Sequence, residues 1–357
     1  MIQAKIVADS LSPQGQRLSS LIVTFPRFIL AELNTHRMLS KNSASSRAIP
    51  THKLLKMVEE NPFIPIAWQK EHKGMQGTEY ITNDLEIASL DLWQRQSAEV
   101  ACNRAKWLME RGVTKQLANR YLEPFMWHTV LISGTEWENF FELRCPQYVL
   151  KGSDEIETVP YRSKKDIFTR YPEGDFYGWT ELEWLQNNKG MAEIHMMALA
   201  EAMWDAMNDS APKRLQAGEW HIPFGEKIDN EQLFNTLGYE DPIMREELKV
   251  KLSTAMAART SYTVVGDEKE VSYETLLGIH DKMAVQVPFH ASPFEHCARA
   301  MDDKEHYNFV RGEGYNDYGG MFSSDQTFND ADRGWCRNYR GFIQYRHILE
   351  NENSTRR

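Results

Sequence analysis

The chain has 357 residues, of which 41% are hydrophobic and 26% are charged, and its formal net charge is −10 at pH 7. Such a composition excludes an intrinsically disordered chain and is sufficient for one large domain or two ordinary ones. The acidic balance argues against a broad nucleic-acid groove, which normally needs a basic excess. It leaves room for a small anionic ligand in a locally basic pocket.

No apolar run reaches 18 residues, so the sequence predicts no membrane span. Residues 1–15 lack the charged start, the apolar block and the small-residue cleavage site of a signal peptide. The four cysteines, at positions 102, 145, 297 and 336, form no CxxC pair. We therefore expect a cytoplasmic protein with reduced, mostly buried cysteines, no structural disulfide and no metal site.

The first predicted element is a strand at residues 21–25, whose branched and aromatic side chains suit a pleated, partly buried surface. Pro26 interrupts it, and residues 28–37 contain helix formers. The serine-rich stretch that follows predicts a loop or a helix start, because serine and asparagine favour caps and turns. Residues 60–82, with their prolines and glycines, predict a loop.

A helix is predicted from about Leu90 to Arg111, with Gly112 as its cap. Its apolar stripe at helical spacing consists of Trp93, Ser97, Val100, Ala101 and Leu108. Residues 114–144 are rich in aromatics and predict core, whereas residues 148–188 show no clear period and predict an insertion. A second helix at residues 192–207 has a methionine-rich stripe, which is typical of core packing.

One stretch is unusually basic for so acidic a chain. From Thr35 to Arg47 it carries His36, Arg37, Lys41 and Arg47, together with four serines, one asparagine and no acid. Arginine forks match phosphate, and serine hydroxyls add short hydrogen bonds. The stretch therefore predicts an anion site, with a solvated helix cap as the alternative.

The same stretch resembles the signature of the flavin-dependent thymidylate synthases, R-H-R-x-x-S-x-N-E-x-S-x-R. The gapless matches are His36, Arg37, Ser40, Asn42, Ser45 and Arg47. The chain departs from the signature at Thr35, where the family has arginine, and at Ser43, where it has an acid. Further similarity lies in NRYLEP with Arg120, in TEWENFFELR with Asn139 and Arg144, and in AEIH, where His195 replaces an arginine.

Three other family motifs stand near the C-terminus: AARTSY at 257–262, HASPFEH at 290–296 and RGFIQYR at 340–346. The first two open the sequence in the family, so this chain resembles two overlapping copies of one half-domain. We predict a nucleotide-binding half at 1–235, with its insertion at about 148–188. A second half-copy with the flavin-loop motifs spans 236–357, and the two form one intertwined unit. Similar long forms occur among bacteriophage proteins.

The resemblance implies an α+β fold, with a helix-rich body around a mixed sheet. It also implies the reductive methylation of dUMP to dTMP with FAD, methylenetetrahydrofolate and NADPH. Members of the family form tetramers whose active sites lie between subunits, so we expect a homo-oligomer, a dimer or a tetramer. The expected partner is a small-molecule nucleotide, not a nucleic acid. No GxGxxG is present, so the flavin is not expected to bind in the Rossmann manner.

The resemblance also assigns roles to individual residues. The catalytic residues are Arg37, Ser45 and Arg120. The substrate-binding residues are Glu32, Thr35, Ser43, Ser45, Arg47, Arg120 and His195. The cofactor-binding residues are His36, Arg37, Asn139, Ser261, His290, Ser292 and Glu295.

Alternatives remain open at this point. Substitutions at Thr35, Ser43 and His195 are compatible with a related enzyme that hydroxymethylates its nucleotide or accepts dCMP, and a decayed, non-catalytic nucleotide binder is a third possibility. Cys145 could act as a nucleophile, as in the folate-only synthases, if neighbouring cations lowered its pKa. A metal at HASPFEH is disfavoured, because the spacing of its histidines fits no standard zinc site.

Overall fold

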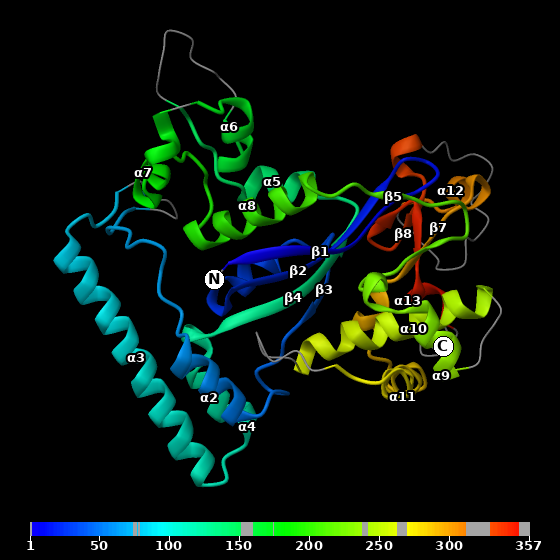
Figure 1. The fold of residues 1–357 in the computed structure, drawn as a ribbon, viewed down its shortest axis with the longest axis horizontal. Helices are drawn as coiled ribbons and strands as arrows, with labels where there is room; N and C mark the ends of the chain where they lie inside the picture. Colours follow the sequence, from blue (N-terminus) through cyan, green and yellow to red (C-terminus); the bar gives the residue numbers. More distant parts are fainter. Residues whose placement is uncertain are drawn as a thin grey trace.

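The computed structural model describes residues 2–73, 77, 79–150, 160–173, 175–237, 242–262, 270–311 and 329–349. The fold is α+β: a mixed five-stranded sheet has helices on both faces, and two small sheets lie beside it (Figure 1). The predicted helix-rich body around a mixed sheet is therefore confirmed. Within the described ranges, no helix is long and apolar enough to cross a membrane.

The five-stranded sheet has the order β3-β4-β2-β1-β5. Its strands are β1 (Gln3–Leu11), β2 (Arg17–Pro26), β3 (Ser40–Ser43), β4 (Trp127–Gly134) and β5 (Lys213–Arg214). Neighbours are antiparallel except for β5, which runs parallel to β1. The predicted strand at 21–25 thus lies inside β2, at the centre of the sheet.

The remaining elements surround this sheet. The helices are α1 (Leu30–Leu33), α2 (Thr51–Glu60), α3 (Asp84–Glu110), α4 (Lys115–Ala118), α5 (Glu138–Arg144), α6 (Lys164–Arg170), α7 (Glu181–Gln186), α8 (Ile194–Asn208), α9 (Asn230–Leu237), α10 (Pro242–Arg259), α11 (Tyr273–Ala284), α12 (Asp303–Asn308) and α13 (Tyr345–Ile348). The small sheets have the orders β10-β7-β6 and β8-β9, made of β6 (Trp220–His221), β7 (Ala298–Ala300), β8 (Trp335–Cys336), β9 (Tyr339–Arg340) and β10 (Phe342–Gln344).

Strand alternation sends apolar side chains to both faces of the sheet. On one face Leu21, Val23 and Phe25 are buried with α5 and α8. The methionine stripe predicted on α8 is buried there as well: Met196, Ala200, Met203 and Met207. On the other face, Leu131 of β4 and Ala257 of α10 share a second cluster. The sheet is therefore the middle layer of the body.

Two sequence predictions were wrong in detail. The serine-rich stretch is partly the edge strand β3, because its backbone pairs with β4 in the register Ser40↔Ser133 to Ser43↔Val130. The long helix α3 begins at Asp84 and not at Leu90, because the Asn83 side chain caps it by accepting a hydrogen bond from the Glu86 amide at 3.0 Å. Gly112, at φ 72°, follows the helix end as predicted.

The predicted insertion at 148–188 forms a satellite aromatic cluster around Tyr148, Phe176 and Trp184. Its helices α6 and α7 project from the body in Figure 1. Glu201 of α8 anchors it, since the carboxylate accepts hydrogen bonds from the Tyr148 hydroxyl (3.0 Å) and the Lys164 amide (2.8 Å). Residues 151–159 and 174 of the insertion lie outside the described ranges.

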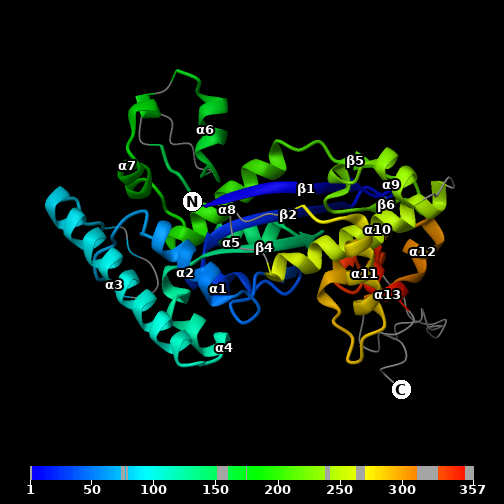
Figure 2. The ribbon, with the colours of Figure 1, turned by 60° about the horizontal axis from the view of Figure 1, so that its bottom comes forward.

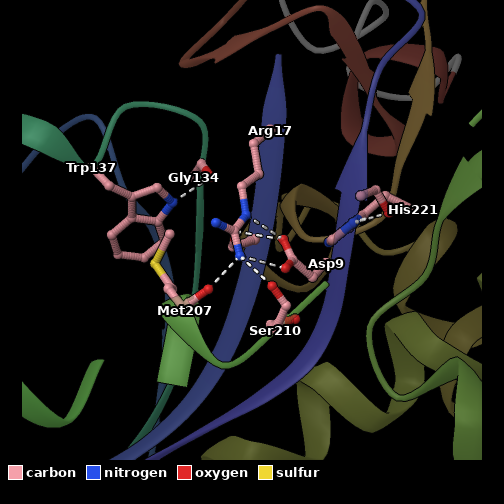
Figure 3. A network of polar contacts seen from close by, with 9 residues as sticks. Asp9, Arg17, Gly134, Trp137, Met207, Ser210 and His221 are labelled. Atoms are coloured by element: carbon pink, nitrogen blue, oxygen red, sulfur yellow. Dashed lines mark hydrogen bonds and ion pairs between the residues drawn. The ribbon is translucent and has the colours of Figure 1, made fainter. Parts of the chain in front are cut away.

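A bidentate ion pair fixes the end of the β1–β2 hairpin against α8 (Figure 3). Arg17 Nε and Nη2 donate to the two oxygens of Asp9 at 2.9 and 2.6 Å, and Nη2 also donates to the carbonyl of Met207 at 2.6 Å. The Asp9 side chain is buried, so this pairing satisfies a carboxylate that could not be left alone. The C-terminus of α8 is thereby held on the sheet.

A chain of buried hydrogen bonds connects the large sheet to the C-terminal elements. His221 of β6 bonds Ser10 (2.9 Å) through Nδ1 and Ser20 (2.8 Å) through Nε2. Ser20 then meets Ser133 (2.5 Å), which bonds Nδ1 of His296 (2.8 Å). Burial lowers the pKa of both histidines to about 3, so each is neutral at pH 7.

This network predicts a loss of stability in mild acid. In the unfolded chain these histidines titrate near 6.5, whereas in the folded protein they titrate at about 3. Between these values the unfolded state binds more protons, so the free energy of unfolding should fall as the pH falls below 6.5. Each histidine contributes up to about 1.4 kcal/mol per pH unit.

The test is urea unfolding of wild type and His221→Asn at pH 7 and pH 5. At pH 7 the variant should be about 1–3 kcal/mol less stable, because buried hydrogen bonds are lost. At pH 5 the difference in unfolding free energy between wild type and variant should be smaller. Wild type loses stability through both histidines, whereas the variant lacks one of these titrating groups. An equal gap at both pH values would contradict a neutral, buried His221.

Candidate functional site

Three motifs that are far apart in the sequence meet at the edge strand β3. The Ser45 amide donates to the carbonyl of Ser261 in AARTSY at 3.0 Å. The Ser292 hydroxyl of HASPFEH donates to Asn42 Oδ1 at 3.1 Å, and Asn42 Nδ2 donates to the carbonyl of Ala257. The buried side-chain amide of Asn42 therefore connects the basic stretch to α10 through its nitrogen and to the HASPFEH turn, η7 (Ser292–Glu295), through its oxygen.

The RGFIQYR motif reaches the same place through Arg346, whose guanidinium pairs with Glu295 at 2.5 Å. Glu295 also lies close enough to Lys41 to act on its charge. Burial lowers the pKa of Lys41 to about 8, and Glu295 partly opposes this shift. Lys41 Nζ donates to the carbonyls of His36 (2.5 Å) and Leu39 (3.1 Å), so it closes the turn that carries the basic residues.

At the start of the stretch, Arg144 at the end of α5 contacts three predicted site residues. Its Nε donates to His36 Nε2 at 3.0 Å, and its two terminal nitrogens lie 3.4 Å from Glu32 Oε2 and from Thr35 Oγ1. Burial lowers the pKa of His36 to about 4, and Arg144 and Lys41 add to the shift. His36 is thus a neutral imidazole whose proton lies on Nδ1.

Glu32 lies near a second carboxylate. Burial and, after it, the charge of Glu193 raise the pKa of Glu32, while Arg144 opposes them. Glu193 also contacts Nδ1 of His195 at 2.5 Å, so Glu32 and His195 have this acidic neighbour in common.

At the end of the stretch, Glu123 is the centre of a second charged group. It accepts from Arg120 (2.7 Å) and from the Ser46 hydroxyl (2.5 Å), and Arg27 lies 3.7 Å away. Arg120 is therefore an exposed but paired cation. Arg37 and Arg47 are exposed, and within the described residues neither forms a hydrogen bond or an ion pair.

Ser43 stands at the position of the acid in the signature that the stretch resembles. Its hydroxyl lies 2.6 Å from Nε2 of His128 on the neighbouring strand β4. Burial lowers the pKa of His128 to about 3, with a smaller contribution from Arg27. A neutral hydroxyl–imidazole pair therefore stands at this position.

Three predicted site residues lie apart from these contacts. His195 is buried on α8, where the Ile66 amide donates to Nε2 (3.0 Å) and Nδ1 faces Glu193 Oε1 (2.5 Å), so both ring nitrogens have protein partners. Asn139 on α5 and His290 before η7 are exposed, and no described contact ties either of them to β3.

The sequence placed Lys41 in the basic stretch and Arg144 in a motif, but it assigned no individual site role to Lys41, Arg144 or Arg346. Arg144 and Arg346 both stand in motifs that resemble the family, so the signal was present, but only the fold shows their partners. Among the residues that the structure describes, no group of three His, Cys, Asp or Glu side chains could hold a metal ion.

Cys145 does not have the environment that a nucleophile needs. It is buried in the core between α5 and α8, and burial raises the pKa of its thiol, which Arg162 only partly offsets. A reactive cysteine needs a lowered pKa and access to substrate. All four cysteines are free and buried, as predicted.

No protein-family model matches the chain, and no curated protein matches its sequence. Among solved structures it is similar to the UMP/dUMP methylase PolB from Streptomyces cacaoi, in two forms that are each 14% identical. The form bound with 5-Br dUMP has a TM-score of 0.34 and covers 45% of this chain and 84% of that chain. The form bound with 5-Br UMP has a TM-score of 0.38 and covers 58% and 88%. Similarity at this level assigns no function to this chain.

Thiol titration tests the assignment of Cys145. With Ellman's reagent at pH 7.5, the native protein should release almost no thiolate within minutes, whereas the denatured protein should release four equivalents. A rapidly reacting native thiol that disappears in Cys145→Ser would reverse the assignment and restore the nucleophile alternative.

Proposed function

We propose that this protein is a flavin-dependent thymidylate synthase, which converts dUMP to dTMP with methylenetetrahydrofolate as the carbon donor and NADPH as the reductant. The observation that supports it is the meeting of the Thr35–Arg47 stretch, AARTSY and HASPFEH at β3, through Ser45, Asn42 and Ser292. Some 210 to 250 residues separate these partners, so their convergence does not follow from local sequence.

The nucleotide phosphate is assigned to the end of the stretch. Arg47 is exposed and has no partner within the described residues, and Ser45 stands two positions before it. A guanidinium fork and a hydroxyl suit a phosphate monoester. Arg120 belongs to the adjacent group and donates a hydrogen bond to Glu123. It would have to leave this partner to bind the phosphate.

The pyrimidine is assigned to the start of the stretch, beside Thr35 and His36. The family arginine is absent at Thr35, but Arg144 brings a guanidinium to within 3.4 Å of the Thr35 hydroxyl. Carbon 5 of uracil is a weak nucleophile, and a fixed cation near a ring carbonyl stabilises the negative charge that develops there. Arg144 and Arg37 are the two candidates for this role.

The donor set around η7 fits a flavin. Ser292 contacts Asn42, Glu295 lies by Lys41, and His290 and Arg37 are exposed. Hydroxyl, carboxylate, imidazole and guanidinium groups are the types that hold the polar edge and phosphates of FAD. When bound, FAD supplies the reducing electrons for the one-carbon adduct, while these residues bind and orient it.

One observation favours a second candidate, a related enzyme that acts on dCMP or that hydroxymethylates its nucleotide. The neutral Ser43–His128 pair replaces the family acid. A carboxylate only accepts hydrogen bonds, whereas this pair can accept or donate. Such a change is expected to alter which exocyclic group of the pyrimidine the site prefers.

Replacing Arg47 by Ala should weaken nucleotide binding roughly ten- to a hundredfold, because a charge-assisted hydrogen bond to phosphate contributes about 1.5–3 kcal/mol. Arg47→Lys should recover part of the loss, since lysine keeps the charge and loses the fork. The measurement is calorimetric titration of dUMP at fixed ionic strength. Arg170→Ala, an exposed arginine at the end of α6, is the matched control and should bind as wild type. Unchanged affinity in Arg47→Ala would mean that the stretch is a solvated surface.

The reaction itself is tested with purified protein, dUMP or dCMP, methylenetetrahydrofolate and NADPH. The protein should be yellow with a flavin absorbance band, and dTMP should form from dUMP in a flavin-dependent manner. 5-Hydroxymethyl products, or turnover of dCMP alone, would establish the second candidate. Nucleotide binding without a flavin band and without product would identify a non-catalytic binder.

A further inference from the structure

The long helix α3 exposes an apolar face that nothing in the described chain covers. Its buried side consists of Ala98, Ala101, Cys102 and Ala105, which pack towards α2. Of the apolar stripe predicted from the sequence, Ala101 is buried, whereas Trp93 and Val100 are 68% and 57% exposed. In Figures 1 and 2, α3 lies at the outer margin of the molecule, with α2 and α4 on its inner side.

The exposed face continues along the helix. Leu85 is 83% exposed, Leu92 54% and Trp107 50%. A single exposed apolar residue needs no explanation, but a row of leucine, valine and tryptophan along one helix is typical of an interaction surface. The same face carries two tryptophans, Trp93 and Trp107. Tryptophan is among the residue types that most often dominate the binding energy of an interface.

The row along this face is symmetric. Its members are Leu85, Ser89, Leu92, Gln96, Val100, Asn103 and Trp107, and all are exposed. The spacings read 4, 3, 4, 4, 3, 4 in either direction, with Gln96 at the centre. If two copies of α3 met antiparallel at Gln96, Leu85 would face Trp107, Ser89 would face Asn103, and Leu92 would face Val100. Apolar positions would then meet apolar ones, and polar positions would meet polar ones.

The charges of α3 have the same complementarity. The residues from Asp84 to Gln94 include three acids and no base, whereas those from Arg95 to Arg111 include four bases and two acids. An antiparallel partner therefore places the acidic half of one helix beside the basic half of the other. The two helix dipoles also oppose each other favourably in this arrangement.

One pair of charges can be identified individually. Glu86 and Arg104 are 18 residues apart, which is five turns of 3.6 residues, so they lie on the same flank of the helix. In an antiparallel pair centred at Gln96, position 88 of one copy lies opposite Arg104 of the other. Glu86 is two residues from that position. Both are exposed, and within the described residues neither side chain forms an ion pair.

We propose that the Leu85–Trp107 face of α3 is the interface between two copies of this chain, with the helices antiparallel about a two-fold axis at Gln96. A two-fold interface must be self-complementary, and this face is so in spacing, polarity and charge. The 27-residue helix is about 40 Å long, so contact along its whole exposed face can supply much of the roughly 800 Å² per partner that a standard interface buries. The proposal does not rest on the proposed function.

The first experiment is sedimentation velocity of the full chain over a concentration series. Wild type should be a dimer or a higher even oligomer at micromolar concentration. Trp93 stands three residues before Gln96 and so lies beside the row close to the axis. Trp93→Glu should raise the dissociation constant at least roughly a hundredfold, because it places one charge from each copy near the axis. Val285→Glu, at a 71% exposed site after α11, is the control and should associate as wild type. A wild type that stays monomeric up to ~100 µM would overturn the proposal.

A charge swap tests the antiparallel geometry and keeps the test valid if Trp93→Glu does not fold. Arg104→Glu should weaken association roughly tenfold by facing Glu86 of the other copy. The double variant Glu86→Arg, Arg104→Glu restores opposite signs across the axis and should associate within about threefold of wild type. Circular dichroism confirms folding of each variant. A double variant as weak as Arg104→Glu, or weaker, would exclude this arrangement.

Discussion

The hydroxyl of Ser133 lies between Ser20 on the neighbouring strand and His296 at the end of HASPFEH, and all three side chains are fully buried. Pairing lowers the cost of burying polar groups, so the packing of the large sheet on the C-terminal elements is favoured in the register that completes this chain. His221 extends it to Ser10 on β1. Nε2 of His296 is the buried atom of this hydrogen-bond chain that has no hydrogen-bond partner among the described residues. Because both histidines are neutral, no charge has to be buried to make this connection.

This constraint explains where the candidate site lies. His296 directly follows Glu295, so fixing its imidazole on β4 places the HASPFEH turn beside the edge strand β3. Asn42 then bonds both Ser292 and Ala257. Protein groups satisfy the inward-facing side chains of the stretch, while Arg37 and Arg47 remain at the surface. A scaffold of neutral hydrogen bonds thus leaves cations available for an anionic ligand.

Sequence patterns predicted a strand or helix correctly where the spacing of apolar residues alone decides the element. The strand at 21–25 and the methionine-rich helix were correct because alternation and 3.6-residue periodicity report burial directly. The serine-rich stretch was misread because residues 40–43 become a strand only through pairing with β4, whose sequence lies some 90 residues away. On α3, periodicity predicted the helix and its apolar stripe but not which side faces the body, since small alanines pack inward and the tryptophans stay outside.

The sequence by itself predicted buried, reduced cysteines from composition. The α+β class and the motif residues that meet at β3 followed from the resemblance, because its signatures are contiguous stretches that can be read without the fold. Only the tertiary structure decided which cations are already paired. Arg120 lies against Glu123 and Arg144 lies against His36, whereas Arg47 has no partner in the described chain. It also decided that His36, His128 and His296 are neutral and that the Cys145 thiol is protonated. Charge pairing and pKa depend on neighbours and desolvation, which residues distant in the sequence supply.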